Sequence, residues 1–579
     1  MFQERYELWI KDRYFDLETR RELIAIQVDQ AEIEDRFYRD LEFGTGGLRG
    51  VLGAGTNRMN KYVVRKVTQG LADYIKDFGE EGTSRGVVIA YDSRLFSPEF
   101  ALETALVLAA NGIRAYLFDA LRPTPELSFA VRYLGAMAGV VITASHNPKE
   151  YNGYKVYWED GGQIPPDKAD SILAKINARE SWSVLPYSQE RALAEGRLEI
   201  IGVEVDRAYL SKVKGLALYH ADQAATEQLS IIYSPLHGAG NLLVNQALLD
   251  FGYKDVFTVP EQELPDPNFS TIAYPNPEIP STFDLARYYG EKQGADLLLA
   301  TDPDADRLGV CVRDQDGSYV QLTGNQVGIL LEYYLLSRKK DAGLLTEKAT
   351  VIKTIASTDL ADDLAKSFGV NIETVLTGFK FIAAKEKEME NGGWGKFEFG
   401  FEESNGYLAG DFVRDKDAVI AAVLCCEAAL FFKQVQKRSL LDVLADIYDK
   451  YGYYMDDQVS ITLKGKQGQE QITQLMDALR ELRLHEIGGL EIERVDDYDQ
   501  SLGRLIATGK TYALTLPRSN VLRFSLRGGG FVMARPSWTE PKIKFYFSVK
   551  GEKHDCARRL EQVTADFLNL VHLSLEQGE

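Results

Sequence analysis

Gly139-Val140-Val141-Ile142-Thr143 is an apolar run that ends in the polar turn Ala144-Ser145-His146-Asn147-Pro148. The same succession, an apolar run of strand character followed by a polar or glycine-rich loop, recurs at 87–94, 231–238, 297–304 and 351–357. Helical patterns follow these loops. Continuous apolar strands alternating with helices are typical of α/β layers with mostly parallel sheets. Ligands of such folds bind at the carboxyl ends of the strands, where these loops lie.

The C-terminal part of the chain has a different pattern. Residues 458–463, 521–526 and 543–549 have the composition of strands, and 554–570 have the periodicity of an amphipathic helix. This succession predicts a smaller α+β domain at the C-terminus. With boundaries near Val205, Gly324 and Tyr454, the expected domains are 1–205, 206–323, 324–454 and 455–579.

The composition is that of a globular protein with a strong acidic balance. The chain has 579 residues, which suits about four domains. Its 66 Lys and Arg against 86 Asp and Glu give a net charge of −20. This balance argues against a partner that is a nucleic acid or an anionic membrane, because both would repel the chain. An anionic small molecule is still compatible with a local basic funnel.

The cysteines and the apolar segments indicate a reducing, cytoplasmic location. Four scattered cysteines are too few for a disulfide framework or a zinc site (Cys311, Cys425, Cys426, Cys556). Residues 1–14 are charged throughout and lack the apolar core of a signal peptide. The most apolar stretch, 418–432, contains Glu427 and is shorter than the ~20 residues that span a bilayer. We therefore expect it to be a buried helix.

Ser145 stands at the end of a predicted strand, where a nucleophilic or phosphorylated serine would be presented. Ser, Asn and Pro are also ordinary turn formers, so the segment alone is equally compatible with a simple turn. A serine hydrolase is a poor match because the nucleophile-elbow pattern G-x-S-x-G is absent. Ala144 and His146 flank the serine, and glycine stands at neither of the two positions that the pattern requires.

Asp302-Pro303-Asp304-Ala305-Asp306-Arg307 carries three carboxylates at alternate positions. The loop lies between two apolar runs, so the three carboxylates would repel one another without a cation. Mg²⁺ binds a few carboxylates and takes its other ligands from water and phosphate. The segment therefore predicts a divalent metal site in preference to a solvated acidic turn.

Three further segments are weaker alone. Residues 400–407 combine carboxylates, a hydroxyl and flanking glycines, which suit sugar hydroxyls. Residues 535–542 place Arg535, Ser537, Thr539 and Lys542 within reach of one phosphate monoester. Residues 43–50 hold several glycines and Arg49, which suit an anion cradle but match neither a Walker A loop nor a dinucleotide fingerprint. Together the five segments indicate phosphoryl transfer on a phosphorylated sugar.

Four of these segments, in this order, resemble the signature loops of the α-D-phosphohexomutases. They are 143–148, 302–307, 400–406 and 535–542, and both 377–380 and 43–50 also fit. Residues 57–71 look most like the longer phosphoglucomutase/phosphomannomutase branch, which also contains phosphopentomutases. The resemblance implies an α/β fold of four domains around a central cleft. Three domains would share a similar mixed α/β sheet core, and the fourth would be the smaller α+β C-terminal domain.

The resemblance also implies residue roles. Ser145 would be the phosphoserine and, with Asp302, Asp304 and Asp306, would bind one Mg²⁺ per active site. Four residues would surround the reacting phosphoryl group: Arg49, His146, Lys155 and Arg307. Glu402 and Ser404 would hold sugar hydroxyls, and Gly378 would belong to a loop that distinguishes two sugar orientations. The non-reacting phosphate would be held by Arg535, Ser537, Thr539 and Lys542. Lys155 is expected to act as an acid/base if burial and cationic neighbours lower its pKa.

Two departures from the family pattern concern the substrate loops. Trp538 stands where the family usually has glycine in the phosphate loop. Asn405-Gly406-Tyr407 stands where some bacterial relatives have a shorter Gly-His ending, so no histidine is available there for proton transfer.

The activity that the resemblance implies is conversion of α-D-glucose 1-phosphate to glucose 6-phosphate, with glucose 1,6-bisphosphate as intermediate and activator. Mannose and pentose phosphates are alternative substrates, and synthesis of glucose 1,6-bisphosphate from another donor is an alternative reaction. A non-catalytic sugar-phosphate sensor is the alternative outside enzymes. We expect a monomer or weak homodimer whose only partners are sugar phosphates.

Overall fold

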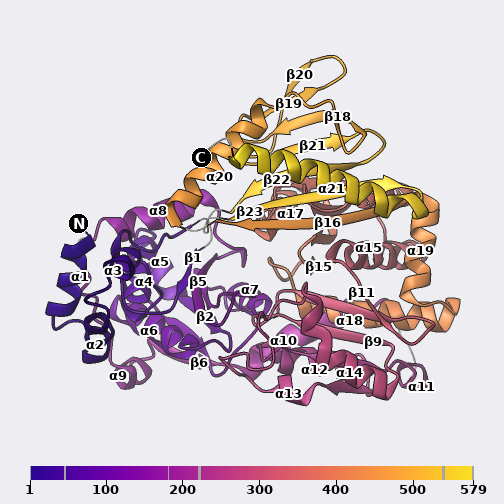
Figure 1. Cartoon of the computed structure of the whole chain (residues 1–579). Helices are drawn as coiled ribbons and strands as arrows, with labels where there is room; N and C mark the ends of the chain where they lie inside the picture. The colour runs from indigo at the N-terminus through magenta and orange to yellow at the C-terminus, as the bar shows by residue number, and fades with distance from the viewer. Residues whose placement is uncertain are drawn as a thin grey trace. The chain divides into compact units, whose positions relative to one another are not determined.

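The computed structural model describes residues 2–44, 47–179, 181–219, 223–463, 465–537 and 542–576. The chain divides into two compact units, which Figure 1 shows in the colours of their residue numbers. The first unit is Met1–Thr323 with Ser404–Val435, and the second is Gly324–Glu403 with Gln436–Glu579.

The first unit begins with a bundle of short helices. These are α1 (Phe2–Lys11), α2 (Leu17–Ala25) and α3 (Gln30–Phe37). Asp16 caps α2 by accepting a hydrogen bond from the backbone N–H of Thr19 at 2.8 Å. The indole of Trp9 is fully buried and stacks on the ring of Phe15, with centroids 4.2 Å apart. Tyr62 of the following helix joins this aromatic cluster and ties the bundle to the rest of the unit.

A mixed sheet forms the first α/β layer, in the order β1-β5-β4-β2-β3-β6. Strands β2, β3, β4 and β6 are parallel neighbours, whereas β5 is antiparallel to both β4 and β1. The strands are β1 (Gly47–Val51), β2 (Val87–Tyr91), β3 (Ala115–Phe118), β4 (Ala138–Ile142), β5 (Tyr151–Trp158) and β6 (Leu198–Ile201). The helices of this part are α4 (Lys61–Lys76), α5 (Gly79–Arg85), α6 (Ser97–Ala110), α7 (Thr124–Tyr133), α8 (Pro166–Asn177), α9 (Gln189–Ala194) and α10 (Val203–Lys214).

Helices cover both faces of this sheet, as strands with buried residues throughout require. Val140 packs into the core that includes α4 and α6. The neighbouring Gly139 faces α7, because a Cβ there would lie 2.6 Å from a methyl carbon of Val131. Successive residues of a strand point to opposite faces, so α7 covers the face opposite to α4 and α6.

The first unit contains a second mixed sheet, in the order β11-β10-β9-β7-β8. Its strands are β7 (Ile231–Ser234), β8 (Val256–Thr258), β9 (Leu297–Thr301), β10 (Leu308–Arg313) and β11 (Tyr319–Gln321). The helices are α11 (Gln223–Thr226), α12 (Gly240–Asp250), α13 (Pro260–Glu263), η1 (Pro280–Phe283) and α14 (Asp284–Gln293). The returning segment adds β15 (Gly406–Leu408), α18 (Ala418–Phe431) and the turn η2 (Phe432–Gln436).

Helix α18 is the expected buried helix. Ala418–Gln436 is long and apolar enough to cross a membrane, but most of it is buried inside the protein. The helix packs on α12 and on strands β9 and β10. Its apolar surface is therefore satisfied by the protein core.

The second unit contains a parallel sheet segment and an antiparallel C-terminal sheet. Strand β12 (Ala349–Thr354) lies between β13 (Asn371–Val375) and β14 (Lys396–Glu402), parallel to both. The helices of this part are α15 (Gly324–Asp341), α16 (Leu360–Phe368), α17 (Phe379–Gly392) and α19 (Leu440–Tyr451).

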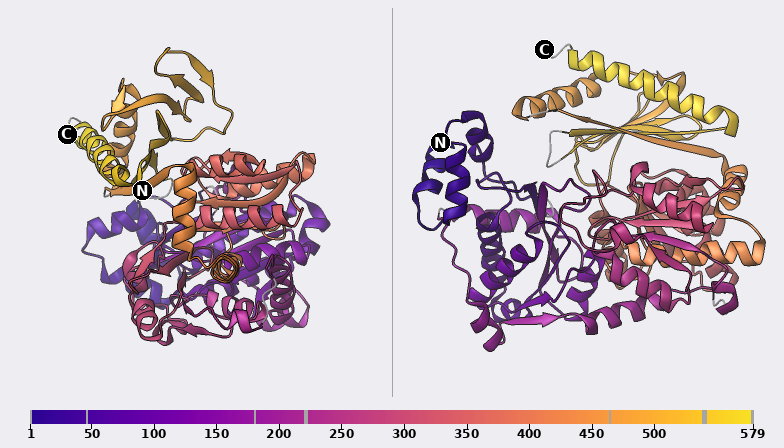
Figure 2. Two further views of the ribbon diagram at one scale, coloured as in Figure 1. Left: turned by 90° about the vertical axis from the view of Figure 1, so that its right-hand side faces the viewer. Right: turned by 60° about the horizontal axis from the view of Figure 1, so that its bottom comes forward.

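The C-terminal sheet has the order β16-β23-β22-β21-β18-β19-β20, with β17 paired to β18. Figure 2 shows α20 (Gly465–Glu481) and α21 (Lys553–Glu576) together on one face of it, where apolar side chains of both helices pack on the strands. The strands are β16 (Tyr453–Thr462), β17 (Glu486–Ile487), β18 (Leu490–Asp497), β19 (Leu502–Leu505), β20 (Thr511–Ala513), β21 (Leu522–Leu526), β22 (Gly530–Pro536) and β23 (Lys542–Gly551).

The predicted fold class is confirmed: α/β layers with mixed sheets precede a smaller, strand-rich C-terminal part. The five apolar runs that define the pattern are β2, β4, β7, β9 and β12. The glycine-rich segment 43–50, for which no strand was predicted, contains most of strand β1. A Cβ on Gly47 would lie 2.0 Å from the carbonyl oxygen of Tyr154, so only glycine allows this edge strand to approach β5.

Trp9→Ala should loosen the N-terminal bundle. The substitution removes a fully buried indole and leaves a cavity beside Phe15, which costs about 3–5 kcal/mol. Hydrogen exchange should therefore accelerate in α1–α3. Leu17→Ala is the control, because the side chain of Leu17 is 63% exposed. Equal effects of the two variants would contradict the packing described here.

Candidate functional site

The hydroxyl of Ser145 lies among acidic and polar groups of the first unit. Strand β4 ends at Ile142, and Ser145 follows with a φ of +51° and 3% exposure. Its Oγ donates a hydrogen bond to Oδ2 of Asp302 at 2.8 Å and lies 3.2 Å from Nδ1 of His146. The sequence placed these groups in segments more than 150 residues apart. The structure brings them into direct contact.

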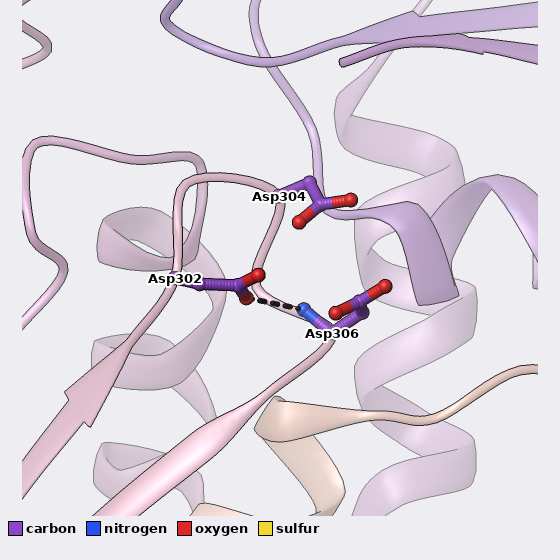
Figure 3. Close-up of side chains that lie close together, drawn as sticks. All are labelled: Asp302, Asp304 and Asp306. Carbon is purple, nitrogen blue, oxygen red and sulfur yellow. Dashed lines mark hydrogen bonds between the residues drawn. The ribbon is translucent and has the colours of Figure 1, made fainter. Parts of the chain in front are cut away.

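The three aspartates converge as the alternate spacing predicted. Asp302, Asp304 and Asp306 occupy the loop between β9 and β10, are all fully buried, and each offers a carboxylate oxygen within 4.8 Å of the others (Figure 3). The backbone N–H of Asp306 donates to Oδ1 of Asp302 at 3.2 Å. Oδ1 of Asp304 and Oδ1 of Asp306 are buried and have no hydrogen-bond partner among the described residues. Hard carboxylate oxygens left free in this way suit a divalent cation such as Mg²⁺.

Cationic side chains partly compensate this cluster. Nζ of Lys155, on β5, lies 2.6 Å from Oδ2 of Asp304 and 3.3 Å from Oδ2 of Asp306. Nζ of Lys416 lies 2.8 Å from the same oxygen of Asp306. The hydroxyl of Thr124, at the start of α7, donates to Oδ2 of Asp304 at 3.0 Å. Together with Ser145, the aspartates are therefore held by two cations and two hydroxyls from other segments.

The protonation of the cluster follows from burial and these neighbours. Burial, with Asp304 and Asp306 nearby, raises the pKa of Asp302 well above its ordinary value. Burial also opposes ionisation of Asp304, but Lys155 outweighs it and the pKa of Asp304 is lowered. Burial lowers the pKa of Lys155, yet Asp304 and Asp306 outweigh it and the net shift is upward. The condition set for an acid/base role of Lys155, a lowered pKa, is therefore not met next to these two carboxylates.

Arg49 and Arg307 lie in the same unit with different partners. Nη1 of Arg49, on β1, donates to the amide oxygen of Asn147 at 2.7 Å, which places it beside the serine loop. Nη1 of Arg307 lies 2.5 Å from Oε1 of Glu278, and its Nε is 3.9 Å from Oδ1 of Asp306. Both arginines were predicted to surround a phosphoryl group, and both lie next to residues of the serine or aspartate loop.

The second unit contains its own cluster of charged groups. Arg535 on β22 lies directly opposite Lys544 on β23, and its Nη1 donates to the hydroxyl of Tyr546 at 3.3 Å. Burial and the charge of Arg535 lower the pKa of Lys380 to about 8. Desolvation and the neighbouring carboxylate of Glu402 raise the pKa of the partly exposed Glu403 to about 7.

The other predicted substrate residues are placed as follows. Gly378 precedes α17 with a φ of +117°, a conformation that favours glycine. The backbone N–H of Ser537 donates to the carbonyl of Lys542 at 2.7 Å. Glu402 ends β14 in the second unit, whereas Ser404 belongs to the first. Thr539 and Trp538 lie outside the described residues.

Sequence reasoning missed several residues of these clusters, above all Lys416, Thr124, Glu278 and Lys544. Lys416 lies in Arg414-Asp415-Lys416-Asp417, a charged run just before the apolar helix α18. That abrupt change from charged to apolar residues was the available signal. A lone threonine or lysine in the other segments gave none.

Comparisons with known proteins agree with the predicted resemblance. Three family models match consecutive parts of the chain: phosphoglucomutase/phosphomannomutase α/β/α domain I at 40–182, domain II at 207–317 and domain III at 323–451. The chain belongs to the phosphoglucomutase/phosphomannomutase family. The boundaries of the four domains remain a prediction, and the segment 404–435 returns to the first unit from within the range matched by domain III.

Phosphoglucomutases of two Staphylococcus species are similar to this protein over nearly the whole chain. A phosphoglucomutase of Staphylococcus saprophyticus is 38% identical over 543 residues, which is 92% of this chain and 94% of the relative. One of Staphylococcus aureus strain USA300 is 38% identical over 91% of this chain and 93% of its own.

Solved structures support the fold alone. Paramecium parafusin has a TM-score of 0.67 at 16% identity, covering 93% of this chain and 96% of its own. A phosphoglucomutase/phosphomannomutase family protein of Burkholderia thailandensis has a TM-score of 0.65 at 20% identity, covering 92% and 97%.

Asp306→Asn should weaken Mg²⁺ binding at least about tenfold, because it removes one charge and one orphan carboxylate oxygen from the cluster. Calorimetric titration of the purified protein with MgCl₂ measures this without any turnover. Asp314→Asn is the matched control, since Asp314 follows the next strand in an exposed turn. Unchanged affinity in Asp306→Asn would show that the cluster holds no metal.

Glu403→Gln should flatten the pH dependence of stability between about pH 4.5 and 7. The carboxyl has a higher pKa in the folded state than the ordinary 4.5, so the folded state keeps a proton that the unfolded state has lost. Stability therefore falls as pH rises through this window, by about 1–2 kcal/mol after allowance for solvent screening. Urea unfolding at pH 5 and pH 8 compares the wild type with the variant. An equal pH dependence in both would contradict the assignment.

Proposed function

We propose that the protein is a phosphoglucomutase that interconverts α-D-glucose 1-phosphate and glucose 6-phosphate through phosphorylated Ser145 and glucose 1,6-bisphosphate. The observation that carries this proposal is the contact between Oγ of Ser145 and Oδ2 of Asp302, at 2.8 Å, within a buried carboxylate cluster. A serine presented to such a cluster suits phosphoryl transfer, because a metal there would face the phosphate. Family membership and the Staphylococcus relatives support the choice of glucose.

Mg²⁺ fits the aspartate cluster, and we propose that Asp302, Asp304, Asp306 and an oxygen of phosphorylated Ser145 hold it. When bound, the cation neutralises negative charge on the transferring group. The protein's own cations add to this. We propose that Lys155 and Lys416 fix the carboxylates, and that Arg49, His146 and Arg307 bind the phosphoryl oxygens. In the forward step the sugar 6-hydroxyl oxygen forms a bond to phosphorus, the bond from phosphorus to Oγ of Ser145 breaks, and the proton of the 6-hydroxyl ends on the freed Oγ.

The second unit supplies the residues proposed to hold the rest of the substrate. Arg535, Ser537, Thr539 and Lys542 would bind the non-reacting phosphate, and the positive charge of Arg535 and Lys544 supports this role. Glu402 and Ser404 would hold sugar hydroxyls, and Gly378 would belong to a loop that distinguishes two sugar orientations. Glucose 1,6-bisphosphate has a phosphate at each end. It can therefore return either one to Ser145, provided that the same anion site accepts the other.

The remaining parts of the proposal concern partners and location. We propose that sugar phosphates are the only ligands, that the chain works as a monomer or weak homodimer in the cytoplasm, and that it binds neither nucleic acid nor membrane. The net charge of −20 supports the last point, and four buried cysteines without a disulfide support a reducing location.

The test is an assay of glucose 1-phosphate conversion with Mg²⁺ and catalytic glucose 1,6-bisphosphate, beside mannose and ribose 1-phosphates. We expect glucose to be preferred and Ser145→Ala to lower turnover by about 10⁴-fold or more. Ser171→Ala, on the exposed side of α8, is the control. Preference for mannose or a pentose would change the substrate and keep the mechanism. Normal turnover by Ser145→Ala would overturn the phosphoserine mechanism. If no sugar phosphate were turned over and glucose 1,6-bisphosphate did not phosphorylate Ser145, the result would favour a non-catalytic sugar-phosphate sensor.

A further inference from the structure

The guanidinium of Arg94 is buried beneath the loop that carries Ser145. Arg94 is 1% exposed. Its Nη2 donates to the carbonyl oxygen of Ser145 at 2.5 Å and to that of Asn147. Its Nη1 donates to the carbonyls of Pro148 at 2.8 Å and Tyr151 at 3.1 Å. One side chain therefore satisfies four backbone acceptors of the loop, all within seven residues of each other.

The N–H side of Ser145 is fixed from the same strand end. The backbone N–H of Ser145 donates to Oγ1 of Thr143 at 2.8 Å, and the Thr143 hydroxyl donates to Oδ2 of Asp92 at 2.6 Å. Oδ1 of Asp92 accepts from the hydroxyl of Ser97 and from the backbone N–H of Arg94. Nε of Arg94 lies 3.3 Å from the Asp92 carboxylate, so the two buried charges compensate each other.

This double attachment explains an otherwise unfavourable backbone. Ser145 has a φ of +51°, a left-handed conformation that non-glycine residues adopt rarely and at a cost. Such a conformation persists only where the surroundings fix it on more than one side. Here Arg94 holds the carbonyl and Thr143 holds the N–H. The result is that the Ser145 hydroxyl points at Asp302.

Phe269 closes the pocket of Arg94. Its ring centroid lies 5.1 Å from Cζ of Arg94, and Phe269 is 2% exposed. An aromatic face at this distance attracts a cation and also excludes water. Water therefore does not compete with the loop carbonyls for the N–H groups of the guanidinium.

We propose that Arg94 is a positioning residue for phosphoryl transfer, acting with Asp92 through Thr143 to hold Ser145 in its left-handed conformation. The inference rests on the proposed role of Ser145 as the phosphoryl carrier. In this role Arg94 acts through the loop carbonyls to which its guanidinium donates. It sets the direction in which the serine oxygen leaves and re-enters the reaction, and a displacement of about 1 Å at such a centre costs roughly 100-fold in rate.

Lysine cannot replace this arginine. A guanidinium has five N–H donors in a rigid plane, whereas an ammonium has three donors on a single nitrogen. Arg94→Lys keeps the buried positive charge beside Asp92 but cannot serve four carbonyls on both sides of the loop. The variant therefore keeps the positive charge but loses part of the hydrogen-bond arrangement at the loop.

The first experiment compares Arg94→Lys with Arg58→Lys in the mutase assay with glucose 1-phosphate. Arg58 is the matched control, since it is 8% exposed and binds the carboxylate of Asp35 and the carbonyl of Asn57 in the N-terminal part of the same unit. We expect Arg94→Lys to lower kcat about 100-fold with KM within about twofold, and Arg58→Lys to change neither. A kcat of Arg94→Lys within twofold of wild type would overturn the inference.

The second experiment tests the other attachment and does not depend on the folding of the Arg94 variant. Phosphorylation of Ser145 by glucose 1,6-bisphosphate is followed by intact mass for Thr143→Val and Thr143→Ser. We expect the valine variant to phosphorylate at least about tenfold more slowly and the serine variant, which keeps the hydroxyl, to restore most of the rate. Equal rates in the two variants would overturn the inference. Failure of the wild type to become phosphorylated at Ser145 would instead overturn the proposed function.

Discussion

Three carboxylates buried within 4.8 Å of one another are the constraint on which the rest of the first unit depends. Ionised groups without solvent repel each other strongly, so the fold must supply cations and donors around them. Lys155 comes from the first sheet, Lys416 from the segment that returns before α18, and Thr124 from the start of α7. The two sheets of this unit and the 404–435 segment are therefore joined at the aspartate cluster. The site and the stability of the unit share the same contacts.

The strand ends determine which side chains can meet there. Strands β2, β4 and β9 each end in a polar loop, and these loops contain Arg94, Ser145 and Asp302. Strands β2 and β4 are parallel neighbours in the first sheet and β9 lies in the second sheet, and in both sheets these loops follow the carboxyl ends of the strands, where α/β proteins bind ligands. Helix α7 then covers one face of the first sheet and brings Thr124 to the same edge. The layers thus place the reacting groups, and hydrogen bonds such as those of Arg94 refine their direction.

The fold class and the aspartate cluster were predictable from the sequence because both are local patterns. Apolar runs with polar ends mark the strands, and carboxylates at alternate positions of one loop converge by themselves. Strand β1 was missed because its glycines suggested a loop, whereas Gly47 is needed for close approach to β5. Lys416 was missed because its partner Asp306 is 110 residues away, and no local pattern reports such a contact. The upward shift in the pKa of Lys155 was not predicted either, because its partners Asp304 and Asp306 lie 149 and 151 residues away in the sequence.

The chain as a whole is strongly negative, but the second unit contains a cluster of positive side chains. The net charge of the chain is −20, yet in the second unit Arg535 lies opposite Lys544, and burial together with the charge of Arg535 lowers the pKa of Lys380 to about 8. Cations forced together in this way cost free energy unless an anion binds among them. An acidic surface repels polyanions at long range, whereas partly buried cations close together attract a small anion at short range, where salt screens the attraction less.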